Sequence, residues 1–191
     1  CDPMDFSFIL DSSGSIGPGN WRKVLNFVKD ILDQMPVERG NVHAGVISFG
    51  NKADLHIDFN DRQDKSSLFS KIDVIPWKDQ WTNTSGGILM ARLYLYSQQH
   101  GDRYYVPDVS VIITDGRSNV ADYLTIPEAT VAKQQGIELY VIGITPQVDL
   151  DEIKGIATAP ADNHVFITRT FDGLRNIRKV LMDRVCVLTG G

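Results

Sequence analysis

The stretch Phe6-Ser-Phe-Ile-Leu-Asp11-Ser-Ser13-Gly-Ser15-Ile-Gly17 joins an apolar run to a turn that is rich in oxygen donors. The apolar run is typical of a strand that is buried on both faces of a parallel sheet. It ends at Asp11, and Ser13 and Ser15 follow at alternate positions. Carboxylate and hydroxyl oxygens are hard donors, which suit Mg²⁺ or Mn²⁺ better than zinc. Because open α/β folds bind ligands at the carboxyl ends of their strands, we predict the functional centre at this turn.

Apolar runs of this kind alternate with helical patterns along the chain. Further strands are expected at 42–49, 53–57, 109–114, 139–144 and 165–168. Apolar residues at helical spacing predict helices at 21–35, 64–72, 88–100, 126–135, 150–157 and 171–185. A turn at 50–51 makes the 53–57 strand the antiparallel partner of the strand before it. The sequence therefore predicts an α/β fold, doubly wound and Rossmann-like, with a mostly parallel central sheet, one antiparallel edge strand and helices on both faces.

The composition narrows the class of protein. Of the 191 residues, 42% are hydrophobic and 23% are charged, which suits one globular domain spanning residues 1–191. The formal net charge of −5 at pH 7 argues against nucleic acid as the main partner. No apolar run approaches the length of a membrane span, so we expect no membrane insertion.

The two cysteines, Cys1 and Cys186, stand at opposite ends of the sequence. Neither has a nearby cysteine or histidine that would suggest a zinc site. A disulfide between them would join the two ends of the domain, and a loop of this length would stabilise the fold by roughly 5 kcal/mol. Such a bridge would favour an oxidising, extracellular setting. The alternative is two unrelated thiols.

Two further loops carry oxygen donors of the same kind. The apolar run 109–114 ends at Asp115, as the first strand ends at Asp11. A polar loop that contains Thr82 leads into the helix expected at 88–100. Loops that follow parallel strands meet at one edge of the sheet. We therefore expect two carboxylates and three hydroxyls, with Ser13 and Ser15 among them, to form an octahedral site that keeps one open position.

These motifs resemble the von Willebrand factor type A domain. They are Asp11-x-Ser13-x-Ser15, Thr82-x-Thr84 before Gly-Gly-Ile-Leu, and Ile113-Thr-Asp115-Gly116. The resemblance covers essentially the whole chain and implies a metal-ion-dependent adhesion site (MIDAS) for Mg²⁺, Mn²⁺ or Ca²⁺. In this family, residues matching Ser13 and Ser15 bind the metal directly, and the one matching Thr82 does so in a high-affinity state. Those matching Asp11 and Asp115 bind directly or through water, and a carboxylate of a partner protein completes the shell.

Two features separate this chain from other members of the family. Trp81 precedes Thr82, where members often have glycine. The flanking cysteines resemble matrix and plasma A domains more than integrin ones, and a bridge between them would restrain the last helix. The resemblance therefore implies a secreted domain of the extracellular matrix, less switchable than an integrin domain and similar to those in matrilins, fibril-associated collagens and byssal matrix proteins. Its expected partner is a protein that offers a carboxylate, with collagen as the specific hypothesis.

Residues around the predicted metal site could contact that partner. Of the three tryptophans, Trp21 fits the core stripe of its helix. A rim of exposed side chains, which can anchor a partner, is expected from Trp77, Trp81, Asn83 and Arg117. The last helix carries several cations that could bind an acidic ligand or simply form a solvated face: Arg175, Arg178, Lys179 and Arg184.

We expect the domain not to be an enzyme. A Mg²⁺-dependent phosphatase could use Asp11 as nucleophile and Asp115 as metal ligand, but that chemistry needs a second carboxylate two residues after the first, where this chain has Ser13. Neither the dinucleotide fingerprint nor a Walker A loop is present. A remaining alternative is a structural matrix domain that assembles with its neighbours through surfaces away from the metal.

Overall fold

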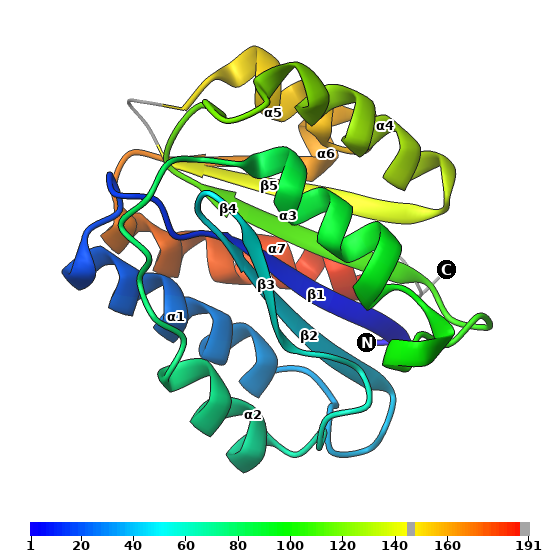
Figure 1. Ribbon diagram of the computed structural model, residues 1–191. Helices are drawn as coiled ribbons and strands as arrows, with labels where there is room; N and C mark the ends of the chain where they lie inside the picture. The colour runs from blue at the N-terminus through cyan, green and yellow to red at the C-terminus, as the bar shows by residue number, and fades with distance from the viewer. Residues whose placement is uncertain (145–147, 188–191) are drawn as a thin grey trace.

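The structure is a computed structural model that describes residues 1–144 and 148–187. Its centre is a six-stranded sheet in the order β3-β2-β1-β4-β5-β6, of which β3 alone runs antiparallel to its neighbour (Figure 1). The parallel sheet, the antiparallel edge strand and the doubly wound order confirm the predicted fold class. The strands are β1 (Met4–Asp11), β2 (Val42–Phe49), β3 (Ala53–Ile57), β4 (Asp108–Thr114), β5 (Ile137–Ile144) and β6 (Val165–Thr168).

Helices cover both faces of this sheet. On one face lie α1 (Pro18–Asp33), α2 (Lys65–Asp73) and α7 (Leu174–Val187). The other face is covered by α3 (Thr84–Met90), α4 (Thr125–Gln134) and α5 (Leu150–Ile156), while the short α6 (Ala161–His164) precedes β6. Figure 1 shows these layers, with the carboxyl ends of the parallel strands on the left. Within the described ranges, no helix has the length and apolar character that crossing a membrane requires.

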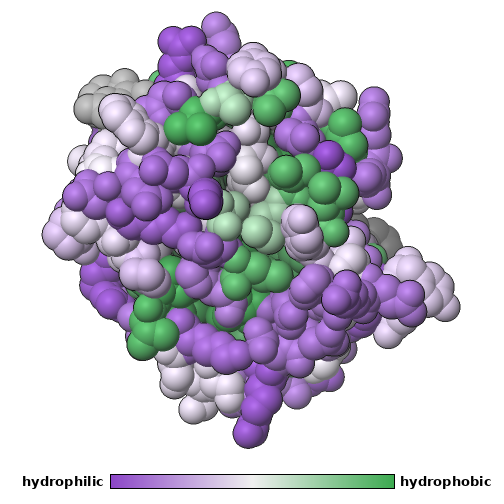
Figure 2. Space-filling view, in the orientation of Figure 1, coloured by the Kyte–Doolittle hydropathy of each residue, from purple (hydrophilic) through white to green (hydrophobic). Residues whose placement is uncertain are grey.

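The alternation of side chains along β1 fills two separate cores. Phe6, Phe8 and Leu10 point toward α1 and α7, whereas Ile9 points toward α3. The first core also takes up Trp21, which is 4% exposed, as its place in the helical stripe predicts. On the face that Figure 2 shows, hydrophilic side chains predominate and hydrophobic ones form smaller patches between them. Most of the apolar residues at periodic positions thus lie between the sheet and its helices.

Two helices differ from their predicted extents. The helix predicted at 88–100 ends at Met90 and continues as a π-helical segment over Ala91–Leu95 and a 3₁₀ turn over Gln98–His100. Leu93, which an uninterrupted helix over 88–100 would place on its apolar face, is 50% exposed. The last helix begins at Leu174 instead of 171, and Val180 on it is 45% exposed. Periodicity alone did not detect the change of helix type, because π-helical turns alter which residues share a face.

Cys1 and Cys186 form the disulfide, with their Cα atoms 4.4 Å apart. The bridge ties the residues before β1 to the end of α7. It lies at the amino-terminal edge of the sheet, opposite the edge where the predicted metal ligands lie. Of the two readings of the cysteines, a terminal bridge is the one that the fold bears out.

Candidate metal centre

The carboxyl end of β1 lies beside the carboxyl end of β4, and this pairing brings together the predicted ligand loops that follow these two strands. Leu10 is opposite Ile113 in the parallel register, so the next residues, Asp11 and Thr114, are neighbours. Thr114 Oγ1 donates to Asp11 Oδ2 at 2.6 Å, and the other Asp11 oxygen accepts from Ser13 N at 2.9 Å. Asp11 is 1% exposed. Its carboxylate is thus held rigidly by two donors at the floor of the site.

Hydroxyl groups connect the turn after β1 to the carboxylate after β4. Ser15 Oγ donates to Asp115 Oδ1 at 2.8 Å, and Ser13 Oγ lies 3.3 Å from Ser15 Oγ. Ser13 is 3% exposed and Asp115 is 7% exposed, whereas Ser15 is at the surface. These contacts join four of the five predicted ligands into one group that opens to solvent.

The loop before α3 docks directly onto the turn after β1. Gly14 N donates to Gln80 O at 2.8 Å, and the indole Nε1 of Trp77 donates to Ser13 O at 2.9 Å. The approach is close enough that a Cβ atom at Gly14 would lie 2.8 Å from Asp79 Oδ1. Glycine at this position therefore lets the two loops meet without displacing the Asp79 side chain.

Thr82, the fifth predicted ligand, reaches the site on this loop. It is 5% exposed, and its backbone bonds to the loop that follows β4. In the described part of the chain, its hydroxyl makes no hydrogen bond to Asp11, Asp115 or either serine. The fold thus brings the three predicted loops to one edge of the sheet. Thr82 lies on the loop before α3, and its hydroxyl is not hydrogen-bonded to the described carboxylates and serines of the site.

The two carboxylates of this group, Asp11 and Asp115, are buried, and the described part of the chain offers them no compensating cation. Burial raises the pKa of Asp11. Burial, and then the charge of Asp11, raise the pKa of Asp115 to about 6. No Lys, Arg or His side chain in the described ranges pairs with either carboxylate. Two carboxylates and several neutral hydroxyls form a donor set that fits Mg²⁺.

The sequence model of the von Willebrand factor type A domain matches residues 5–180. The chain belongs to this family. That membership confirms the resemblance on which the site was predicted.

Individual relatives of this A domain are matrix proteins by name. Matrilin-1 of Gallus gallus is 27% identical over 184 residues, which are 96% of this chain and 36% of matrilin-1. Vitrin of Mus musculus is 30% identical over 182 residues, or 95% of this chain and 27% of vitrin. Proximal thread matrix protein 1 (PTMP1) of the mussel byssus has the same fold, with a TM-score of 0.91 at 24% identity over 97% of this chain and 49% of that one. The chain thus spans half or less of the length of these relatives.

The four predicted rim residues of the A domain do not share one environment. Trp81 is 66% exposed beside Thr82. Trp77 instead packs against the core and bonds to the turn after β1. Asn83 caps α3 by accepting from Gly86 N. Arg117 is exposed and lies 3.6 Å from Asp149. Trp81 and Arg117 are therefore the rim members with free surface, and Trp77 and Asn83 have structural contacts.

Sequence reasoning did not single out two side chains that support the A-domain site. Thr114 ends the apolar run of β4, and only the strand register shows that its hydroxyl reaches Asp11. Asn119 follows Asp115 by four residues, and its side chain accepts from Thr82 N at 2.8 Å. An Asn in a glycine-containing loop is an ordinary turn residue, so no sequence signal distinguished it.

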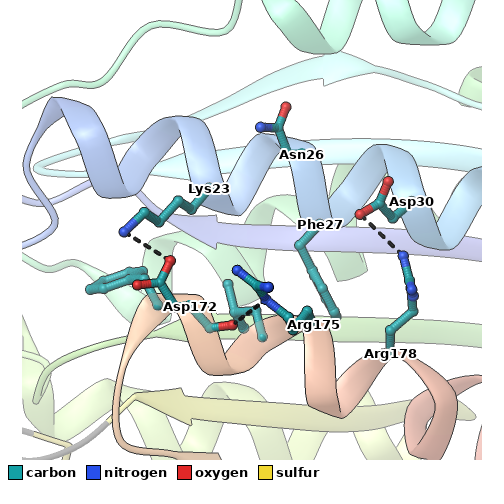
Figure 3. A pocket seen from close by; sticks show the side chains of 9 residues that line it. Lys23, Asn26, Phe27, Asp30, Asp172, Arg175 and Arg178 are labelled. Atoms are coloured by element: carbon teal, nitrogen blue, oxygen red, sulfur yellow. Dashed lines mark hydrogen bonds and ion pairs between the residues drawn. The ribbon is translucent and has the colours of Figure 1, made fainter.

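Of the four cations predicted on the last helix, Arg178 and Lys179 form ion pairs, whereas Arg175 and Arg184 form none with a described carboxylate. Figure 3 shows the groove between α1 and α7, where Lys23 pairs with Asp172 and Arg178 with Asp30. Lys179 pairs with Asp183 one turn further along α7. These ion pairs neutralise part of the face and favour the interpretation that it is a solvated surface.

Proposed function

We propose that this chain is a secreted adhesion domain of the extracellular matrix that binds a protein ligand through a divalent metal. The observation that carries the proposal is the convergence of hydroxyl donors from the ends of β1 and β4 and the turns after them on two buried carboxylates that no cation in the described part of the chain neutralises, with the Thr82 loop docked beside them. Its matrix setting is supported by the names of its relatives, and its secretion by the disulfide between Cys1 and Cys186.

The residues that would hold the metal are those predicted from the sequence, each with its own role. Ser13 and Ser15 would offer neutral oxygens, Asp11 and Asp115 the negative charge, and Thr82 a further hydroxyl. Bound Mg²⁺ would supply an electrophilic position that attracts a carboxylate of the partner. One PTMP1 structure has a zinc-occupied MIDAS motif, so zinc belongs in the tests although the oxygen donors favour Mg²⁺, Mn²⁺ or Ca²⁺.

The surface around the site supports a protein partner. Trp81, the residue before Thr82, exposes a large aromatic side chain, and exposed tryptophans are typical anchors at interfaces. Arg117, on the loop after β4, is exposed but pairs with Asp149, so a partner would compete with that ion pair. As partner we propose collagen, on the grounds of the matrix-type relatives.

The test measures binding of the purified domain to immobilised fibrillar collagen in Mg²⁺, in zinc and in EDTA. Asp11→Ala removes a proposed ligand, and Trp81→Ala removes the proposed anchor. We expect binding to be lost in EDTA and with Asp11→Ala, and to weaken at least tenfold with Trp81→Ala, which corresponds to about 1.4 kcal/mol.

Other outcomes separate the alternatives. Binding that survives both EDTA and Asp11→Ala would place the interface on another face and favour a matrix-assembly role away from the metal. An absence of collagen binding, together with saturable Mg²⁺ binding, would rule out collagen but keep the metal site. No enzymatic activity is proposed, since relatives such as matrilin-1 and integrin alpha-X are matrix and adhesion proteins.

A further inference from the structure

Thr82 is held by a loop other than its own. All of its hydrogen bonds to described residues go to positions 119 and 120. Asn119 Oδ1 accepts from Thr82 N at 2.8 Å, while Asn119 N and Val120 N donate to Thr82 O at 3.0 and 3.3 Å. The residues before and after Thr82 bond instead to the turn after β2. Thr82 is therefore fixed to the loop after β4 on both its amide and its carbonyl side.

This double attachment determines where the Thr82 hydroxyl can lie. A backbone amide at a residue that is 5% exposed needs an acceptor, and the Asn119 side chain is the one present. Mg²⁺ demands near-ideal octahedral geometry at about 2.0–2.1 Å. A shift of a few tenths of an ångström in Thr82 would therefore weaken its contribution to a metal site.

The Asn119 loop is in turn held by α5. Ser118, the residue before Asn119, is 1% exposed. Its amide donates to Glu152 Oε2 at 3.1 Å, and its hydroxyl donates to Glu152 Oε1. Glu152 stands in the first turn of α5, where the Asp149 side chain caps the helix by accepting from Glu152 N. A half-buried carboxylate at the start of α5 thus binds both donors of Ser118.

We propose that Asn119 is a positioning residue for Thr82, and that Glu152 positions the loop that carries Asn119. Together they link α5 to the metal site, so the placement of α5 sets the affinity for the metal. The inference rests on the proposed metal-binding function. It adds two residues to that function and a route by which a partner that contacts α5 would regulate the site.

The test compares Mg²⁺ affinity, by isothermal titration calorimetry, with the unfolding temperature of the metal-free domain. Asn119→Ala removes the acceptor for Thr82 N, and Glu152→Ala removes both acceptors for Ser118. We expect each variant to bind Mg²⁺ about 10–100-fold more weakly, the range typical for partners that orient metal ligands. The amide of Thr82 should also exchange its hydrogen faster in metal-free Asn119→Ala.

Two further variants separate positioning from a general structural role. Glu152→Gln can still accept from Ser118 N and donate to its hydroxyl, so we expect it to restore most of the Mg²⁺ affinity. Asp151→Ala, an exposed acidic neighbour on α5, should bind Mg²⁺ like the wild type. A purely structural role would lower the unfolding temperature of the alanine variants and leave their Mg²⁺ affinity unchanged.

The outcomes distinguish failure of the link through Asn119 and Glu152 from failure of the proposed metal-binding function. Wild-type domain that binds Mg²⁺, with both alanine variants within twofold of it, would overturn the link through Asn119 and Glu152 alone. Wild-type domain that binds no Mg²⁺ would overturn the proposed metal function and the link together.

Discussion

The two ends of β1 and β4 both carry acidic groups, and the groups differ in what neutralises them. At the carboxyl ends, Asp11 and Asp115 are surrounded by hydroxyls. At the amino ends, Asp5, Asp102 and Asp108 each place a carboxylate oxygen within 4.8 Å of the others. There Arg103 enters the group, with its Nε 2.8 Å from Asp5 Oδ1 and its backbone N 2.6 Å from Asp5 Oδ2.

Arg103 also links neighbouring chain segments at the amino-terminal edge through hydrogen bonds. Its guanidinium donates to the carbonyls of Met4, Gly40 and Asn41 at 2.8–3.0 Å. Burial raises the pKa of Asp5, whereas the hydrogen bonds that Arg103 donates to Asp5 lower it. At the amino-terminal edge, one buried carboxylate is thus paired with a cation of the protein itself, whereas at the other edge no described cation pairs with either carboxylate. Clustered carboxylates alone do not distinguish a metal site from an internal ion pair.

The largest expected effect comes from removing the internal cation. Arg103→Ala would keep the backbone bond to Asp5 but leave this fully buried carboxylate without the guanidinium charge. We expect the free energy of unfolding to fall by about 3–5 kcal/mol, as for other broken buried ion pairs. Urea unfolding at pH 7 measures it. Arg103→Lys keeps the charge but loses the planar fork, so its free energy of unfolding should lie between those of Arg103→Ala and the wild type. Equal stability of Arg103→Ala and wild type would show that the amino-terminal group needs no cation.

The disulfide tests whether the two edges are energetically separate. Replacing both Cys1 and Cys186 by Ser should lower the free energy of unfolding by about 2–4 kcal/mol, the typical value for disulfides, which is below the roughly 5 kcal/mol of the chain-entropy model. Because the bridge lies at the amino-terminal edge, we expect the Mg²⁺ affinity to remain within twofold of that of the wild type. The measurements are urea unfolding and calorimetric titration of the same preparation. A large loss of Mg²⁺ affinity would instead mean that restraint of α7 reaches the metal site.

Asp11→Asn tests the need for an external cation at the carboxyl edge. The Asn amide can accept from Ser13 N and donate to Thr114 Oγ1, whose own hydrogen can then turn from residue 11 to Gly116 O, 3.1 Å away. The metal-free variant should therefore be at least as stable as the wild type, because a buried charge is removed. Stabilisation by Mg²⁺, about 2.7 kcal/mol at a hundred times Kd, should disappear. Thermal unfolding with Mg²⁺ and with EDTA measures both, and a strongly destabilised metal-free variant would contradict this account.

The smallest effect concerns pH at the amino-terminal edge. Asp102 Oδ1 and Asp108 Oδ1 are buried oxygens without a hydrogen-bond partner in the described structure. Burial, and then the neighbouring Asp102 and Asp5, raise the pKa of Asp108 to about 8. The folded state therefore keeps a proton that the unfolded chain releases near pH 4, and this contribution to stability is lost as the pH rises toward 8.

Asp108→Asn isolates that contribution, because an amide stays neutral at every pH. Relative to wild type, the variant should gain stability between pH 5 and pH 9 in urea unfolding. The gain should be well under about 1.4 kcal/mol per pH unit, since the side chain is partly exposed. If the difference in stability between the variant and the wild type does not change with pH, Asp108 holds no extra proton in the folded state.

The metal-site prediction came from the sequence because each motif is local. Asp11, Ser13 and Ser15 lie on one turn, and Asp115 follows a recognisable strand. Parallel strands bring their carboxyl ends to one edge whatever the details of packing, so order along the chain implied proximity in space. The two cores were predictable for the same reason, because the period of apolar residues states which side of a strand or helix is buried.

The tertiary structure decided the features that depend on register and on contacts between distant loops. Thr114 and Asn119 acquire their roles only when β1 pairs with β4 and the Thr82 loop docks, since neither residue type marks such a site by itself. Likewise, Asp5 and Asp108 stand about a hundred positions apart in sequence, and only the sheet register joins them to Arg103. Local patterns determine which segments form strands and helices, whereas the partner of each buried charge follows from three-dimensional packing, because electrostatic interactions depend on distance in space.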